Sequence, residues 1–179
     1  MASIPIVSQF PSRKQPSRPW WWPSAPWRRC PRRPSWQQLV HDPQARPRFA
    51  WESAVANHYL HLLGPLAWDH FPERNLEVIH GFPAVPFTPF VAACLVKLDR
   101  QLPYMSHLRQ YLVEHPALTW LLGFPLVPSR CYSWGFDVEA SLPSARHFTR
   151  MLLRVPNDSL QWLLDKTVHR LLAGLTQPF

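Results

Sequence analysis

The sequence predicts an all-α protein, a compact bundle of five or six short helices joined by proline-rich turns and preceded by a disordered, basic N-terminal arm. Glycine is scarce, with 5 residues, whereas proline is abundant, with 22, and this combination favours short helices with abrupt ends. Apolar residues recur at helical spacing through most of residues 49–179. We therefore assign residues 1–48 to the arm and residues 49–179 to one helical domain.

The arm is set apart by its charge. Residues 1–48 carry nine Lys and Arg against one acid, whereas residues 49–179 carry ten against ten, so the excess positive charge, +8 in all, lies in the first quarter. Two interpretations stay open: a nucleic-acid-binding arm, in which arginine neutralises phosphate and tryptophan stacks on bases, or a low-complexity extension without a selected role. The candidate phosphate contacts in the arm are Arg28, Arg29, Arg32 and Arg33.

Prolines, glycines and capping residues mark where each helix begins and ends. The predicted helices cover residues 49–64, 89–102, 104–115, 116–123, 145–153 and 159–172. Gly64 ends the first helix, and Thr88 is expected to cap the second. Ser144 is expected to cap the fifth, and Asp158 the sixth, with Gln161 as its capping-box partner. Residues 65–86 are broken by four prolines and are predicted to form a loop with at most one turn.

The stretch "WGFDVEA" lies in a region, residues 124–143, that we expect to be extended or looped. An extended chain would place Phe136, Val138 and Ala140 on one side, with Asp137 and Glu139 on the other, roughly 7 Å apart. Such a pair could serve acid–base chemistry, but no further carboxylate completes a two-metal site. We therefore predict a polar loop edge and no catalytic residue.

Other catalytic and metal chemistry has little support in the sequence. His58 and His61 lie three residues apart, but no cysteine or carboxylate completes a ligand set with them. Cys30, Cys94 and Cys131 are widely spaced, which is typical of a protein from a reducing cytoplasm. No apolar run reaches the roughly 18–20 residues that span a bilayer. We predict a soluble cytoplasmic protein with no metal, no cofactor and no membrane partner.

The helix after Ser144 carries the clearest functional pattern. Its predicted buried face consists of Ala145, Phe148, Met151 and Leu152. On the other side a basic row follows the spacing i, i+4 and i+8, made of Arg146, Arg150 and Arg154 with His147 beside it. No acid within the helix neutralises this row. It could lie along a DNA backbone and contact phosphates, or it could be a solvated face without a ligand.

Longer stretches of the chain resemble a known family. They are "PFVAACLVKLDRQLPYMSHLRQYLVEHPALTWLLGFPLVPS" and "WGFDVEASLPSARHFTRMLLRVPNDSLQWLLDKTV". Together they resemble the N-terminal helical region of bacterial insertion-sequence transposases of the DDE class, from about residue 36 to about residue 172. The most specific points are "LxxYLxxHPALxWLLGF" at residues 108–124, "GFD", "LPSARHFxR" and "PNxxLQxLLD".

This resemblance implies a function in DNA transposition. In the family, the helical region precedes an RNase H-like core, whose three carboxylates bind two Mg²⁺ ions, and helps to bind transposon ends and to assemble the protein on DNA. The sequence ends at "GLTQPF", before the strand that would carry the first catalytic Asp. Asp137, Glu139 and Asp165 match non-catalytic positions. The resemblance thus implies a truncated transposase, which is not an enzyme on its own.

The function expected from the resemblance is that of a DNA-binding and assembly module, associated with the nucleoid. Its expected partners are duplex DNA at transposon ends and either a second copy of the chain or a full-length transposase. Two alternatives stay open: a protein–protein interaction module, which would use the same helices, and a decayed gene product with no selected activity.

Overall fold

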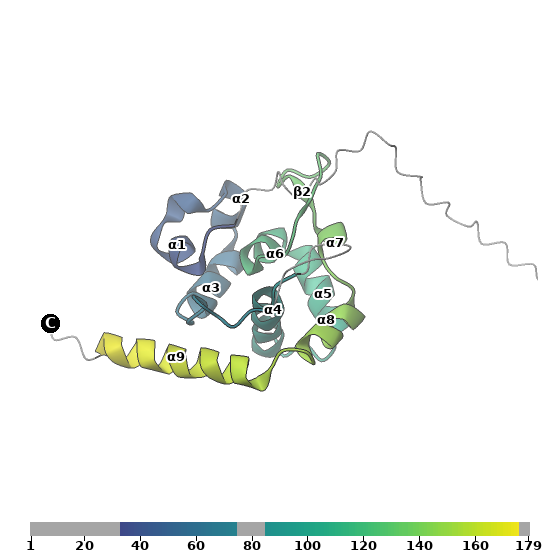
Figure 1. Cartoon of the computed structure of the whole chain (residues 1–179). Coiled ribbons are helices and arrows are strands. Elements are labelled where there is room, and N and C mark those ends of the chain that lie inside the picture. The colour runs from purple at the N-terminus through teal and green to yellow at the C-terminus, as the bar shows by residue number, and fades with distance from the viewer. Residues whose placement is uncertain (1–32, 75–84, 176–179) are drawn as a thin grey trace, which may run out of the picture.

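A computed structural model describes residues 33–74 and 85–175 (Figure 1). The remaining residues, which include the predicted arm up to residue 32 and most of the second half of the predicted loop 65–86, lie outside the described part. The helices are α1 (Trp36–His41), the 3-10 turn η2 (Pro43–Ala45), α2 (Arg48–Trp51), α3 (Ala54–Leu63), α4 (Phe87–Asp99), α5 (Met105–Glu114), α6 (Pro116–Leu122), α7 (Val138–Ser141), α8 (Ala145–Leu152) and α9 (Asn157–Leu175). Strands β1 (Val127–Pro128) and β2 (Phe136–Asp137) pair antiparallel.

The predicted all-α fold class is confirmed for the described residues. The predicted helix 49–64 is divided into α2 and α3, because Ser53 caps a new helix start. The other five predicted helices correspond to α4, α5, α6, α8 and α9, and α1 and α7 are further short helices. Helices α3 to α6 pack on one another, and α8 packs on α4 and α5 (Figure 1). Helix α9 runs along one edge of this bundle, and the hairpin of β1 and β2 lies at the opposite end (Figure 1).

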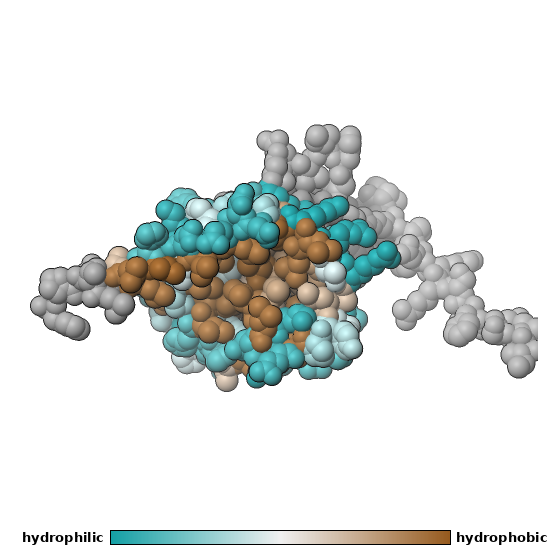
Figure 2. Space-filling view, turned by 90° about the horizontal axis from the view of Figure 1, so that it is seen from below, coloured by the Kyte–Doolittle hydropathy of each residue, from teal (hydrophilic) through white to brown (hydrophobic). Residues whose placement is uncertain are grey.

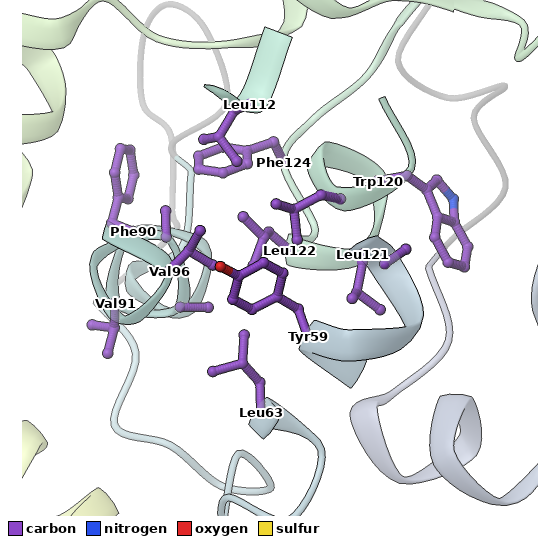
Figure 3. Packing of buried hydrophobic residues seen from close by; sticks show 14 of the residues in the cluster. Tyr59, Leu63, Phe90, Val91, Val96, Leu112, Trp120, Leu121, Leu122 and Phe124 are labelled. Atoms are coloured by element: carbon purple, nitrogen blue, oxygen red, sulfur yellow. The ribbon is translucent and has the colours of Figure 1, made fainter. Parts of the chain in front are cut away.

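The core fills the space between α3, α4, α5 and α6 (Figure 3). Tyr59 and Leu63 from α3 point toward Val96 of α4, and Leu112 of α5 and Leu122 of α6 close the cluster (Figure 3). The hydroxyl of Tyr59 donates a hydrogen bond of 2.8 Å to a carboxylate oxygen of Asp99 at the end of α4. The one polar atom of this large buried ring is therefore satisfied.

The boundary of the arm at residue 48 is wrong, because residues 33–48 belong to the folded domain. Ser35 and Gln38 form a capping box at the start of α1, and Trp36 and Leu39 on that helix are buried. The ring of Trp36 stacks on Trp68, with 5.5 Å between centroids. A helix of six residues is too short to give a periodic apolar pattern, so the composition of this segment concealed it.

The start of α4 also differs from the prediction. The helix begins at Phe87, and Thr88 lies in its first turn instead of at the N-cap position. The carboxylate of Glu73 accepts hydrogen bonds from the backbone N–H of Phe87, from that of Thr88 at 3.0 Å, and from the Thr88 hydroxyl. A side chain fourteen residues upstream therefore satisfies the first amides of α4, and its charge is favourable at a helix N-terminus.

Of the other predicted helix ends, those at Ser144, Gly64 and Gly123 are confirmed, whereas the one at Asp158 is wrong. Ser144 caps α8 as predicted, since its hydroxyl accepts from the backbone N–H of His147 at 3.3 Å. Gly64 follows α3, and Gly123 ends α6 in the left-handed region with φ 86°. Asp158, however, lies inside the first turn of α9, so its assignment as a cap is wrong. The side-chain amide of Gln161 donates to Asp165 instead of completing a capping box.

Removing the Glu73 cap should destabilise the protein. We expect Glu73→Ala to lower the free energy of unfolding by about 1–2 kcal/mol, because the amides of Phe87 and Thr88 lose a charged acceptor. Glu52→Ala is the matched control, since it removes only an exposed ion pair with Arg48 and should cost less than about 0.5 kcal/mol. Urea denaturation of the two variants gives the comparison. Equal losses would contradict the cap.

Candidate nucleic-acid interface

Helix α8 is held in one orientation by its buried face. Phe148 and Met151 are fully buried, as predicted, whereas Ala145 and Leu152 are only half-buried. The ring of Phe148 makes edge contacts with Phe90 of α4, at 5.4 Å between centroids, and with Phe124, at 5.5 Å. With this face fixed, the remaining face of α8 must point outward.

Arg146 and Arg150 lie on the outward face of α8, and both are exposed. Arg154 is exposed too, but it lies in the turn after α8, where its backbone N–H donates to the Met151 carbonyl at 3.0 Å. The predicted basic row is therefore not confined to one helix, because Arg146 and Arg150 lie on α8 and Arg154 lies in the turn that follows it. Within residues 33–74 and 85–175, none of these three guanidinium groups forms an ion pair with a carboxylate.

Arg74 joins this group, although sequence reasoning missed it. One of its Nη atoms lies 3.9 Å from the Met151 sulfur, and its guanidinium lies 5.8 Å from the centre of the Phe87 ring. Its pKa is lowered by burial and by the positive charge of Arg154. Arg74 comes from the segment before α4, so no spacing along the sequence relates it to α8.

The pKa of His147 is affected by the positive charges of the same arginines. The ring is half-buried, 5.8 Å from the Phe90 ring. Its pKa is lowered by burial and by the positive charges of Arg150, Arg74 and Arg154. Burial and these charges therefore favour the neutral imidazole. We call Arg74, His147, Arg150 and Arg154 the α8 basic cluster, because the positive charges of the three arginines all lower the pKa of His147.

The remaining candidates lie elsewhere. Arg28, Arg29 and Arg32 are outside the described residues. Arg33 is packed against Gly123 at the end of α6 instead of on α8. The hydrogen bond from the Ala140 N–H to Asp137 makes that carboxylate the N-cap of α7, and Glu139 is exposed, 3.7 Å from Arg109. Asp137 thus has a structural task, and the expectation that these carboxylates are not catalytic stays a prediction.

Helix α9 carries a second surface of interest, which is apolar and exposed. Apolar residues recur at helical spacing along α9, but of its leucines whose side chains the structure describes only Leu163 is buried, together with Ser159 and Thr167 on the same side of the helix. Leu160, Leu164, Val168 and Leu171, which we call the α9 apolar stripe, are 42%, 59%, 45% and 54% exposed. Figure 2 shows apolar surface along the length of α9 that widens over the body of the protein.

The packed side of α9 contacts the turns after α3. The Ala67 N–H donates to the Thr167 hydroxyl at 3.1 Å, which in turn donates to the Leu163 carbonyl at 2.7 Å. The guanidinium of Arg170 donates to the Leu66 carbonyl and to Asp69, at 3.1 and 3.0 Å. This narrow contact fixes α9 and leaves the stripe open to solvent.

Comparison with known proteins identifies no relative, since no protein-family model, curated protein or solved structure matches the chain. In the described part of the chain, no helix is both long and apolar enough to cross a membrane. The same residues contain no group of three or more His, Cys, Asp or Glu side chains arranged to hold a metal ion.

The pKa of His147 should reveal the basic cluster. NMR titration is expected to give a value below the ordinary 6.5, because burial and three arginines disfavour the imidazolium. Since the folded pKa lies below the unfolded one, this residue should lower stability as the pH falls below about 6.5. Arg150→Gln should raise the pKa of His147, whereas Arg48→Gln should not. A His147 pKa that is indifferent to Arg150 would contradict the cluster.

Proposed function

We propose that the chain is a helical module that binds duplex DNA and helps to assemble a DDE-class insertion-sequence transposase on transposon ends. The α8 basic cluster carries this proposal. Arg150 and Arg154 are exposed and without acidic partners in the described part, and Phe148 holds α8 rigidly against the core. Positive groups fixed in this way, without neutralising acids, favour contact with phosphate.

The sequence supports the same proposal. The stretches that resemble the N-terminal region of these transposases include "LPSARHFxR", which supplies Ser144, the buried Phe148 and Arg150. The elements that hold the cluster in place are therefore the ones in which the resemblance is most specific. The excess of positive charge in residues 1–48 adds a long-range attraction toward a polyanion.

Removing two arginines from the cluster should weaken DNA binding. We expect Arg150→Ala with Arg154→Ala to lower duplex affinity at least about tenfold at low salt, and to reduce the slope of log K against log salt by about 2. The charge-matched control is Arg48→Ala with Arg130→Ala, on α2 and in the β1–β2 turn, away from α8. Gel-shift titrations across salt concentrations measure both. Equal losses in the two pairs, or affinity that ignores salt, would contradict the proposal.

A second function, self-association or pairing with a full-length transposase, is favoured by the α9 apolar stripe. The stripe residues follow the spacing 4, 4 and 3, which forms one seam along a helix. Apolar surface of this extent on a soluble protein is typical of an interaction face. On this proposal, the stripe of one copy packs against that of another.

Charge on the stripe should abolish self-association. We expect the wild-type chain to form a dimer in light scattering at micromolar concentration, and Leu164→Glu to be monomeric, because a carboxylate cannot be buried in an apolar seam. Trp51→Glu, at a residue 55% exposed on α2, is the control and should stay dimeric. A wild-type monomer, or a dimer that survives Leu164→Glu, would exclude the seam.

A further inference from the structure

A cavity of about 500 Å³ is lined by residues from four parts of the chain. These are the segment that precedes α1, helix α2, helix α6 and strand β2, each with adjoining residues, and they lie away from α9 (Figure 1). Its walls include the aromatic residues Phe49, Trp120, Trp134 and Phe136. Phe49 makes ring contacts with Trp120 at 6.2 Å and with Phe136 at 5.9 Å. Figure 3 shows the Trp120 indole at the edge of the core cluster, turned away from Tyr59.

Arg33, which is half-buried, is one of the residues that line this cavity. Its Nε and one Nη atom are inaccessible to solvent and donate no hydrogen bond. The guanidinium lies 4.4 Å from the centre of the Trp36 ring and against Gly123, where a Cβ would come within 2.8 Å of the other Nη. Burial lowers the pKa of Arg33 to about 9, so the group keeps its charge at neutral pH. A buried cation without an acceptor is costly unless something else supplies the acceptor.

Arg46 and Trp134 also line the cavity, and each has a buried donor atom without a partner. Arg46 donates one hydrogen bond to the Asn57 amide oxygen at 2.9 Å, but its Nε is buried and unpaired. The indole N–H of Trp134, which stacks on Tyr132, is also buried and unpaired. No acidic residue is among the described residues that line the cavity. Two arginine side chains and four aromatic rings therefore line the cavity without a countercharge.

We propose that this cavity binds a planar aromatic group that carries an anionic substituent, as a nucleotide does. The ring would lie against the Trp and Phe side chains, and the phosphate would accept from Arg33 and Arg46. A volume of about 500 Å³ is in the range of small-ligand pockets. The ligand could be a free nucleotide or a nucleotide within single-stranded DNA. This site is separate from the α8 basic cluster and does not depend on the DNA binding proposed for it.

Calorimetry with four probes tests the proposal: thymidine monophosphate, thymidine, inorganic phosphate and a single-stranded oligothymidylate. We expect the monophosphate or the oligonucleotide to bind at least tenfold more tightly than thymidine or phosphate alone. Tight binding of the monophosphate indicates a free nucleotide as ligand, and tight binding of the oligonucleotide alone indicates a nucleotide within a strand. No binding of either, or equal binding of phosphate alone, would overturn the proposal.

Variants distinguish this site from the α8 cluster. Arg33→Gln and Trp134→Ala should each weaken binding at least tenfold, because one removes the charge and the other an aromatic wall. Arg150→Ala with Arg154→Ala should leave it unchanged. Arg46→Gln gives a second charge variant in case Arg33→Gln unfolds, which circular dichroism would show. Binding that survives both Trp134→Ala and a folded charge variant would overturn the site.

Discussion

The contact among Phe90, Phe124 and Phe148 determines where the α8 basic cluster lies. These rings come from α4, from the residue after the αL end of α6, and from α8, and their centroids are 5.4 to 5.7 Å apart. Edge-to-face packing of this kind fixes both the distance and the rotation of α8 relative to the core. The outward direction of Arg146 and Arg150 and the place of the following turn with Arg154 all depend on it.

The helices could be predicted from sequence because prolines, glycines and apolar periodicity act within a few residues. Ser144 and Gly123 correctly predicted helix ends, because each residue acts only on the helical turn next to it. The prediction that Thr88 caps α4 was wrong, because the acceptor for the first amides of α4 is Glu73, which only folding brings to that position. The segment around Trp36 failed for a related reason, since its stacking partner Trp68 lies far along the sequence.

In the candidate sites, too, some residues could be predicted from the sequence and others could not. Spacing along one helix identified Arg146, His147 and Arg150, but not Arg74, which reaches the cluster from another segment. Sequence composition placed Arg33 in a solvated arm, whereas its guanidinium is enclosed beside an aromatic cavity. Apolar residues recur at helical spacing in α9, but this periodicity does not tell whether such a face packs inside the protein or remains on its surface.

The narrow attachment of α9 has a geometric consequence. Leu163 and Thr167 on the packed side and Leu164 and Val168 on the stripe share one rigid helix. Buried Val155 also anchors the short connection from α8. Because each residue of a helix adds 100° of rotation, inserting one residue between Val155 and Leu163 would turn the stripe away from its present heading relative to α8. The length of this connection therefore sets the angle between the α9 apolar stripe and the outward face of α8.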